Sequence, residues 1–99
     1  MPKKVDANQP QIVAELRQLW FLVHITSDLG RGFPDLVVGD RRTNRVFLFE
    51  VKNPEEAWKL TEREGEFHEL WGAMVHVIET TEDALEIMGY AMTSSEIEI

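Results

Sequence analysis

Hydrophobic residues near the start of the chain recur every three or four positions. They are Ile12, Val13, Leu16, Leu19 and Trp20. This spacing places them in one core-facing stripe, so we predict a helix from about Gln9 to Leu19 that lies on a sheet. Asn8 is its predicted N-cap, because Pro10 falls in the first turn. The β-branched and aromatic residues at 21–25 predict a strand, and a loop with two glycines follows it.

Two further strands are predicted in the middle of the chain, at 35–39 and 46–52. The polar residues 40–45 join them as a hairpin turn. Side chains alternate between the two faces of a strand. One face of the third strand therefore holds Val46, Leu48, Glu50 and Lys52. This alternation puts a carboxylate beside an ammonium at the end of the strand.

The next segment predicts a second helix and a fourth strand. Thr61 and Glu64 match the S/T-x-x-E capping box that begins many helices. The apolar side of this helix consists of Phe67, Leu70 and Trp71. Gly72 ends the helix, and residues 74–78 form the next predicted strand.

A last helix is predicted after Thr80 or Thr81, either of which can cap it. Its apolar residues are Ala84, Leu85 and Met88, and Gly89 marks its end. Residues 90–99 are expected to be a loose tail, and the first nine residues a short polar arm. The order of helices and strands predicts an α/β fold, with one mixed sheet flanked by helices in a single domain over residues 1–99.

Composition limits the classes to which the protein can belong. The chain has 99 residues, 43% of them hydrophobic, which is enough for one core but not two. The absence of cysteine excludes disulfides, thiolate nucleophiles and cysteine-bound zinc. No apolar run approaches the length of a membrane helix, and the N-terminus lacks the apolar stretch of a signal peptide. We therefore expect a soluble cytoplasmic protein with no membrane partner.

The charge is unevenly distributed along the chain. The net charge is -8, which by itself argues against a nucleic-acid partner. However, all 10 basic residues lie in residues 1–63, where they face 9 acidic residues, whereas residues 64–99 hold 9 acidic residues and no Lys or Arg. An acidic balance also suits a protein that binds a divalent cation, so composition leaves a DNA partner open.

Asp35, Glu50 and Lys52 are the candidates for chemistry. Pairing of the hairpin strands can bring the carboxylate of Asp35 toward that of Glu50, and two close negative charges are costly unless a cation lies between them. Magnesium suits such a site, because it binds one or two carboxylates and keeps several waters. The carbonyl of Val51 is a further expected ligand. Taken singly, each of the three side chains is more typical of a surface ion pair or a turn.

The segments GFPDLVVG and VFLFEVK contain the P-D...(D/E)-x-K signature of the PD-(D/E)XK nuclease superfamily. Together with DAN, KLT, FHELW and VHVIETTEDAL, they resemble the small stand-alone VRR-NUC domains of phages and bacteria over residues 6–89. The resemblance implies a restriction-endonuclease-like αβββαβ core. It also implies Mg²⁺, or Mn²⁺ in its place, held by Asp35 and Glu50, with Lys52 assisting a metal-activated water that cuts DNA to leave 5'-phosphate and 3'-hydroxyl ends.

Two supporting positions depart from this resemblance. Gln9 stands where relatives carry a glutamate, and Glu64 where they carry a glutamine. Gln9 is expected to point toward the sheet, whereas Glu15, the nearest acidic substitute, is expected to point into solvent. Glu64 can act either in the site or only as the capping partner of Thr61. His68 has the same ambiguity, because a lone histidine on a helix is usually a packed residue.

DNA contacts are expected from exposed basic and aromatic residues. The candidate phosphate contacts are Arg31, Arg41, Arg42, Arg45, Lys59 and Arg63. Trp20 and Trp71 fit apolar stripes of the predicted core, so Trp58 is the candidate for stacking on a base. His24 and His76 lack a second ligand at metal spacing, which argues against zinc.

Three functions remain open, of which the third is an acidic adaptor that makes no contact with DNA. The first is a homodimeric, structure-selective endonuclease that resolves four-way (Holliday) junctions or nicks branched DNA, because a domain this small has one active site and cutting two strands needs two. The second is a non-catalytic module on a degenerate nuclease fold that binds DNA or a replication partner. Gln9 and the acidic second half of the chain motivate the second hypothesis.

Overall fold

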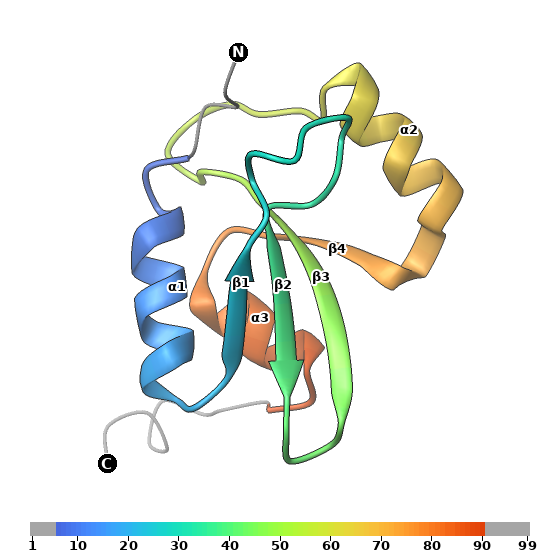
Figure 1. Ribbon diagram of the computed structural model, residues 1–99. Helices are drawn as coiled ribbons and strands as arrows, with labels where there is room; N and C mark the ends of the chain where they lie inside the picture. Colours follow the sequence, from blue (N-terminus) through green and yellow to red (C-terminus); the bar gives the residue numbers. More distant parts are fainter. Residues whose placement is uncertain (1–5, 91–99) are drawn as a thin grey trace.

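The computed structural model describes residues 6–90 and contains one mixed sheet flanked by helices (Figure 1). The elements follow the predicted order and differ from the predicted bounds by one or two residues. They are α1 (Gln9–Gln18), β1 (Leu22–Ile25), β2 (Leu36–Asp40), β3 (Arg45–Val51), α2 (Glu62–Trp71), the 3-10 helix η1 (Gly72–Met74), β4 (Val75–Ile78) and α3 (Thr81–Ile87). The α/β class and the mixed sheet are therefore as predicted.

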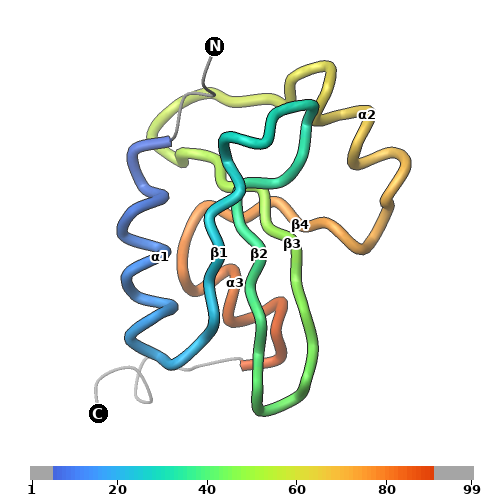
Figure 2. The backbone as a smooth tube through the Cα atoms, in the orientation of Figure 1, coloured from blue at the N-terminus to red at the C-terminus, as the bar shows by residue number. Residues whose placement is uncertain are grey.

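The four strands lie in the order β1-β2-β3-β4. Strand β2 runs antiparallel to both β1 and β3, and β4 runs parallel to β3. The predicted hairpin is present, with Gly39 opposite Val46 and Leu36 opposite Phe49. The loops before β2 and before α2 gather at one end of the sheet, and the hairpin turn forms the other end (Figure 2).

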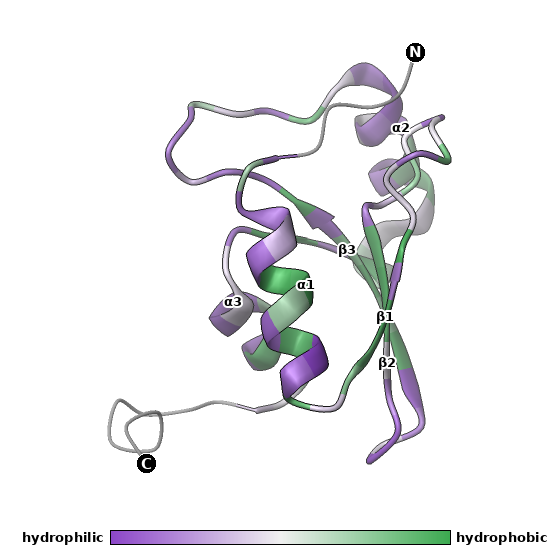
Figure 3. Cartoon of the chain, turned by 60° about the vertical axis from the view of Figure 1, so that its left-hand side comes forward, coloured by the Kyte–Doolittle hydropathy of each residue, from purple (hydrophilic) through white to green (hydrophobic). Residues whose placement is uncertain are grey.

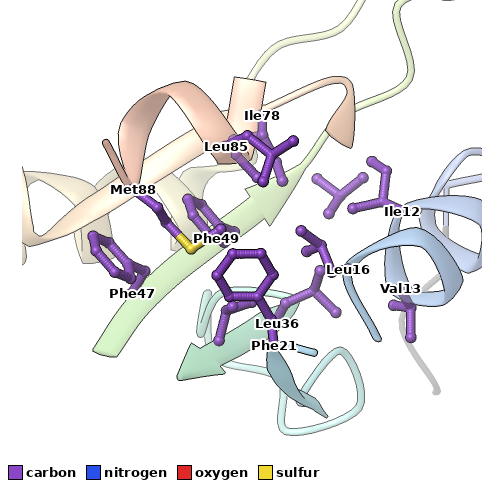
Figure 4. Packing of buried hydrophobic residues seen from close by; sticks show 13 residues of the cluster. Ile12, Val13, Leu16, Phe21, Leu36, Phe47, Phe49, Ile78, Leu85 and Met88 are labelled. Carbon is purple, nitrogen blue, oxygen red and sulfur yellow. The ribbon is translucent and has the colours of Figure 1, made fainter. Parts of the chain in front are cut away.

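Helices α1 and α3 cover one face of the sheet, and α2 lies near the end where β3 stops (Figures 1 and 3). The core between α1, α3 and the sheet consists of side chains that alternate along β2 and β3 with helix residues facing them (Figure 4). Burying this apolar area is the main stabilising contribution. The fully or nearly buried members are Ile12, Val13, Leu16, Phe21, Leu36, Val38, Phe47, Phe49, Val51, Ile78, Ala84, Leu85 and Met88.

Three apolar residues that helical spacing predicts to be buried are exposed. Leu19 is 40% exposed, and Trp20 is 74% exposed because it lies in the turn after α1 with a φ of 71°. Leu70 on α2 is 82% exposed. Only part of the predicted apolar side of α2 is packed: the rings of Phe67 and Trp71 stack with their centroids 4.9 Å apart.

Three polar predictions were also wrong in detail. The Asn8 side chain makes no cap hydrogen bond, although Asn8 occupies the N-cap position of α1. Glu15 is partly buried, and its carboxylate accepts a hydrogen bond from the Thr81 hydroxyl, because α3 packs beside α1. Tyr90, the first residue of the expected loose tail, is fixed by a hydrogen bond from its hydroxyl to Asp40 and by an edge contact with Phe21.

The remainder of that expected tail, 91–99, and most of the expected N-terminal arm, 1–5, lie outside the described residues. Within residues 6–90, no helix combines the length and the apolar character that crossing a membrane requires.

Candidate active site

Asp35, Glu50 and Lys52 meet where β2 begins and β3 ends. Leu36 pairs with Phe49, so Asp35, the residue just before β2, lies on the same face of the hairpin as Glu50. The three side chains are almost completely buried, with exposed fractions of 2%, 0% and 8%. One Asp35 carboxylate oxygen accepts a hydrogen bond of 2.8 Å from the backbone N–H of Val51. The pairing of the hairpin therefore brings the predicted residues together.

Glu64 belongs to the same cluster. The Lys52 ammonium lies 2.8 Å from Glu64 Oε1 and 3.7 Å from Glu50 Oε2. The same Glu64 oxygen accepts a hydrogen bond from the backbone N–H of Thr61, and the Thr61 hydroxyl accepts one from the Glu64 N–H. The capping box and the contact with Lys52 thus occur together. The Glu64 carboxylate therefore both caps the first turn of α2 and positions the buried Lys52 ammonium.

A close approach of backbones holds α2 beside the site. A Cβ atom at Gly32 would lie 2.1 Å from the carbonyl oxygen of Arg63, and Gly32 has a φ of +79°. Only glycine fits without strain at such a position. The rings of Phe33 and Phe67 also meet edge to face, with centroids 5.4 Å apart. The loop before β2 therefore sets the position of Glu64 relative to Lys52.

The segment before α1 closes the other side of the site. The Asn8 amide nitrogen donates hydrogen bonds to the carbonyls of Lys52 at 3.0 Å and of Glu79 at 2.8 Å. These bonds connect the start of α1 to the ends of β3 and β4. They explain why the Asn8 side chain makes no cap hydrogen bond, since it binds carbonyls of residues far away in the sequence. Local spacing did not reveal these partners.

Asp6 is a charged neighbour of the site that the residue pattern did not single out. Burial raises the pKa of Asp6 above its usual range. The Lys52 ammonium opposes this shift, and the carboxylates of Asp35, Glu56 and Glu64 add to it. Asp6 begins the DAN segment of the family resemblance, which was the one sequence signal that could have indicated it.

Gln9 points inward, as predicted, and is 3% exposed. Its amide nitrogen donates a hydrogen bond of 3.0 Å to the Ser27 hydroxyl. Within the described part of the chain, its buried Oε1 has no hydrogen-bond donor. Buried acceptors are rarely left in this state. The Gln9 Oε1 is therefore a buried acceptor that none of the described residues uses.

His68 lies in the electrostatic field of the cluster. Burial lowers the pKa of His68, Glu64 opposes this shift, and Lys52 and His76 add to it. Its Nε2 is buried and, among residues 6–90, has no hydrogen-bond partner. His76 packs against the Phe49 ring, and burial lowers its pKa as well. His24 is exposed on the edge strand β1.

The predicted phosphate contacts fall into two groups. Arg31, Lys59 and Arg63 are exposed on segments that flank the cluster. Arg41, Arg42 and Arg45 are exposed at the hairpin turn, at the opposite end of the sheet. Two of this second group have local contacts. Arg42 donates to the Leu19 carbonyl and lies over the Phe21 ring, and Arg45 lies over the Phe47 ring.

Trp58, the predicted stacking residue, is 41% exposed, and its indole N–H donates to a Glu79 carboxylate oxygen at 2.8 Å. Among residues 6–90, no three histidine or acidic side chains are grouped so as to hold a metal ion. Magnesium does not need three, because one or two carboxylates with carbonyl and water ligands satisfy it. The neighbouring carboxylates of Asp35 and Glu50 are therefore donors of the kind that magnesium prefers.

Comparisons of the chain with protein-family models, with curated proteins and with solved structures give no match.

Proposed function

We propose that the protein is a magnesium-dependent endonuclease that hydrolyses phosphodiester bonds of DNA. In this proposal its fold is restriction-endonuclease-like and it is a VRR-NUC member of the PD-(D/E)XK superfamily. The observation that carries the proposal is the buried cluster of Asp35, Glu50 and Lys52 at the end of two paired strands. Burying charged groups is costly, and proteins concentrate such groups at functional sites.

In this proposal, the carboxylates of Asp35 and Glu50 and the Val51 carbonyl hold Mg²⁺, and Mn²⁺ can replace it. When bound, the ion supplies charge neutralisation at the phosphate and a lower pKa for a coordinated water. The Val51 N–H donates to one Asp35 oxygen, which fixes the orientation of this carboxylate at the end of β3. Gln9 supports the site as a neutral oxygen donor.

Lys52 has the role of orienting the attacking water and the scissile phosphate. Its ammonium is held between Glu50 and Glu64, which restricts its position before substrate arrives. A group fixed in advance stabilises developing charge without reorganising during the reaction. Glu64 is therefore a positioning residue for Lys52. Arg31, Lys59 and Arg63 flank this cluster and are the proposed phosphate contacts nearest to it.

The proposed substrate is branched DNA such as a four-way junction, and the proposed assembly is a homodimer. One chain supplies one cluster, and symmetric cutting of two strands requires two. Light scattering at micromolar concentration should give about twice the 11.5 kDa mass of the chain. A monomer mass with symmetric junction cutting would contradict the dimer.

The experiment that tests the function uses labelled four-way junction, nicked duplex and linear duplex DNA. Each is incubated with the protein and Mg²⁺, Mn²⁺ or a chelator. Cleavage that requires either metal and is fastest on the junction supports the proposal. Intact DNA in every condition, together with measurable binding, would contradict it.

A non-catalytic DNA-binding module is the second candidate. The amide of Gln9 favours it, because a neutral group binds a metal ion more weakly than a carboxylate does. The Asp35→Ala variant separates the two functions. A binding module keeps its function when this carboxylate is removed, whereas an endonuclease loses cleavage.

A further inference from the structure

An open hollow of about 570 Å³ lies over β1 and the neighbouring ends of β2 and β3. Leu22, Gly39 and Val46, which pair across the strands, line it on the face of the sheet that α1 and α3 leave uncovered. Arg17 of α1, Phe21 and Val23 also line it, so the hollow extends around the edge strand β1. Its position is next to the hairpin turn. The cluster of Asp35, Glu50 and Lys52 lies at the opposite end of the strands.

Three large apolar side chains are exposed in this hollow. Trp20 is 74% exposed, Leu22 54% and Val46 68%. Grouped apolar exposure of this kind usually marks a contact surface. We call these residues, together with Arg17, His24 and Arg41, which also line the hollow, the Trp20 surface.

The Trp20 ring is presented by a fixed backbone turn. The Trp20 N–H donates to the Arg17 carbonyl at 3.0 Å, and the Phe21 N–H donates to the Leu16 carbonyl at 3.0 Å. Trp20 has a φ of 71°, which is unusual for an aromatic residue. Such conformations persist where the surrounding structure determines them. The backbone that carries the exposed ring is thus fixed before any ligand binds.

The charge of the Trp20 surface differs from that of the whole chain. The residues that line the hollow include Arg17, Arg41 and His24 and no Asp or Glu, although the net charge of the chain is -8. Local positive charge favours an anionic partner. An aromatic ring beside arginines is the combination that binds single-stranded nucleic acid, through stacking on a base and contacts with phosphates.

The Trp20 surface and the cluster share one face of β3. Val46, Leu48, Glu50 and Lys52 alternate onto that face, from the hollow at one end to the buried ammonium at the other. The four residue-to-residue steps along β3 from Val46 to Glu50 span roughly 13 Å. A DNA strand bound at the cluster can therefore extend along this face of β3 to Val46, which lines the hollow together with Trp20.

We propose that the Trp20 surface binds an unpaired segment of DNA, with Trp20 stacking on a base and Arg17 and Arg41 contacting phosphates. This inference rests on the proposed nuclease function, which makes DNA the anion in question. Bases of an intact duplex are stacked on each other, so their faces are closed to Trp20. The surface selects DNA that contains unpaired nucleotides, such as a fork with single-stranded arms.

The test is equilibrium binding of fluorescein-labelled DNA to the full chain in chelator, where no metal-dependent cleavage occurs. The probes are a single-stranded oligothymidylate, a fork with unpaired arms and a blunt duplex. Trp20→Ala should weaken binding of the first two about tenfold, within the range for losing one base stack. Trp20→Phe should restore most of the affinity. Binding of the blunt duplex should change less than about twofold, since it offers no base to stack.

Leu70→Ala is the matched control, because Leu70 is also large, apolar and exposed but lies on the acidic helix α2. It should bind all three DNAs as the unchanged protein does. A second readout is tryptophan emission. Single-stranded DNA should quench it, and this quenching should be weaker in Trp20→Phe but unchanged in Trp71→Phe, since the Trp71 ring is stacked on Phe67. Arg41→Ala should lower the salt dependence of binding by about one phosphate contact.

Unchanged affinity of Trp20→Ala for single-stranded DNA and the fork would overturn the inference. So would a lower mass of Trp20→Ala in light scattering together with an equal loss for all three DNAs, which would make the surface a contact between two copies. Either result leaves the nuclease intact if the unchanged protein still cuts and Asp35→Ala does not. A protein that neither cuts nor binds DNA would overturn both proposals.

Discussion

Lys52 and Glu64 form a buried pair whose geometry serves both folding and the proposed chemistry. Their charged atoms are 2.8 Å apart, and the side chains are 10% and 3% exposed. A single oxygen of Glu64 accepts from both Lys52 and the Thr61 N–H. Removing the Glu64 charge leaves the buried Lys52 ammonium with the more distant Glu50 carboxylate, 3.7 Å away, and a buried charge that loses its close partner is costly.

We therefore expect Glu64→Gln to lower the free energy of unfolding by about 3 kcal/mol. The amide can still accept the Thr61 hydrogen bond, so the loss comes from the charge on Lys52. Urea unfolding followed by circular dichroism measures it. Glu66→Gln, an exposed change on the same helix, is the control and should cost less than about 0.5 kcal/mol. Equal stability of the two variants would show that the ion pair contributes little.

His76 gives the stability a predictable dependence on pH. Burial lowers its pKa in the folded protein, so the unfolded chain binds the proton more readily. The free energy of unfolding should therefore fall as pH drops below about 6.5, the usual histidine pKa. His76→Gln should make the slope between pH 7 and pH 5 shallower in urea unfolding. A slope that is unchanged in His76→Gln would contradict this assignment.

The placement of α2 depends on the close backbone contact between Gly32, in the loop before β2, and Arg63. Gly32 approaches the Arg63 carbonyl so closely that any side chain must displace the first turn of α2. That turn carries Glu64, whose carboxylate positions Lys52. The local conformation of one loop residue is thus connected to the geometry of the cluster through the helix.

Gly32→Ala should destabilise the protein by more than about 2 kcal/mol, because it combines a strained φ with a backbone clash. Gly65→Ala is the matched control: it lies in α2, and a Cβ there meets no atom within 4 Å. It should leave the stability unchanged or raise it by about 1 kcal/mol. Thermal unfolding of the two variants measures the difference. Equal stabilities would show that α2 tolerates displacement.

The alternation of β3 and the capping box of α2 were readable from the sequence because each depends on residues a few positions apart. Glu50 and Lys52 share a face since strand side chains alternate, and Thr61 and Glu64 lie three residues apart. Asn8 was misread because its partners, Lys52 and Glu79, are 44 and 71 residues away. Trp20 was misplaced because spacing does not show where a helix stops and its apolar stripe leaves the core.

At the scale of the whole molecule, the two proposed functional sites lie at opposite ends of one sheet. The buried cluster lies at the end where β3 stops, and the Trp20 surface lies beside the hairpin turn. The predicted phosphate contacts divide between these ends, which their sequence positions did not reveal. In the proposed function, the first end cuts DNA and the second recognises its unpaired part.

The most direct test of the central claim compares cleavage of a labelled four-way junction by Glu50→Gln and Glu86→Gln in Mg²⁺. Both remove one negative charge at nearly constant volume, but Glu50 is completely buried in the cluster and Glu86 is exposed on α3. Circular dichroism and thermal unfolding confirm that each variant is folded. We predict a loss of at least a hundredfold in cleavage rate for Glu50→Gln, in the range for removing one group that stabilises the transition state, and no loss for Glu86→Gln. Equal cleavage by the two folded variants would contradict a catalytic site at Asp35, Glu50 and Lys52.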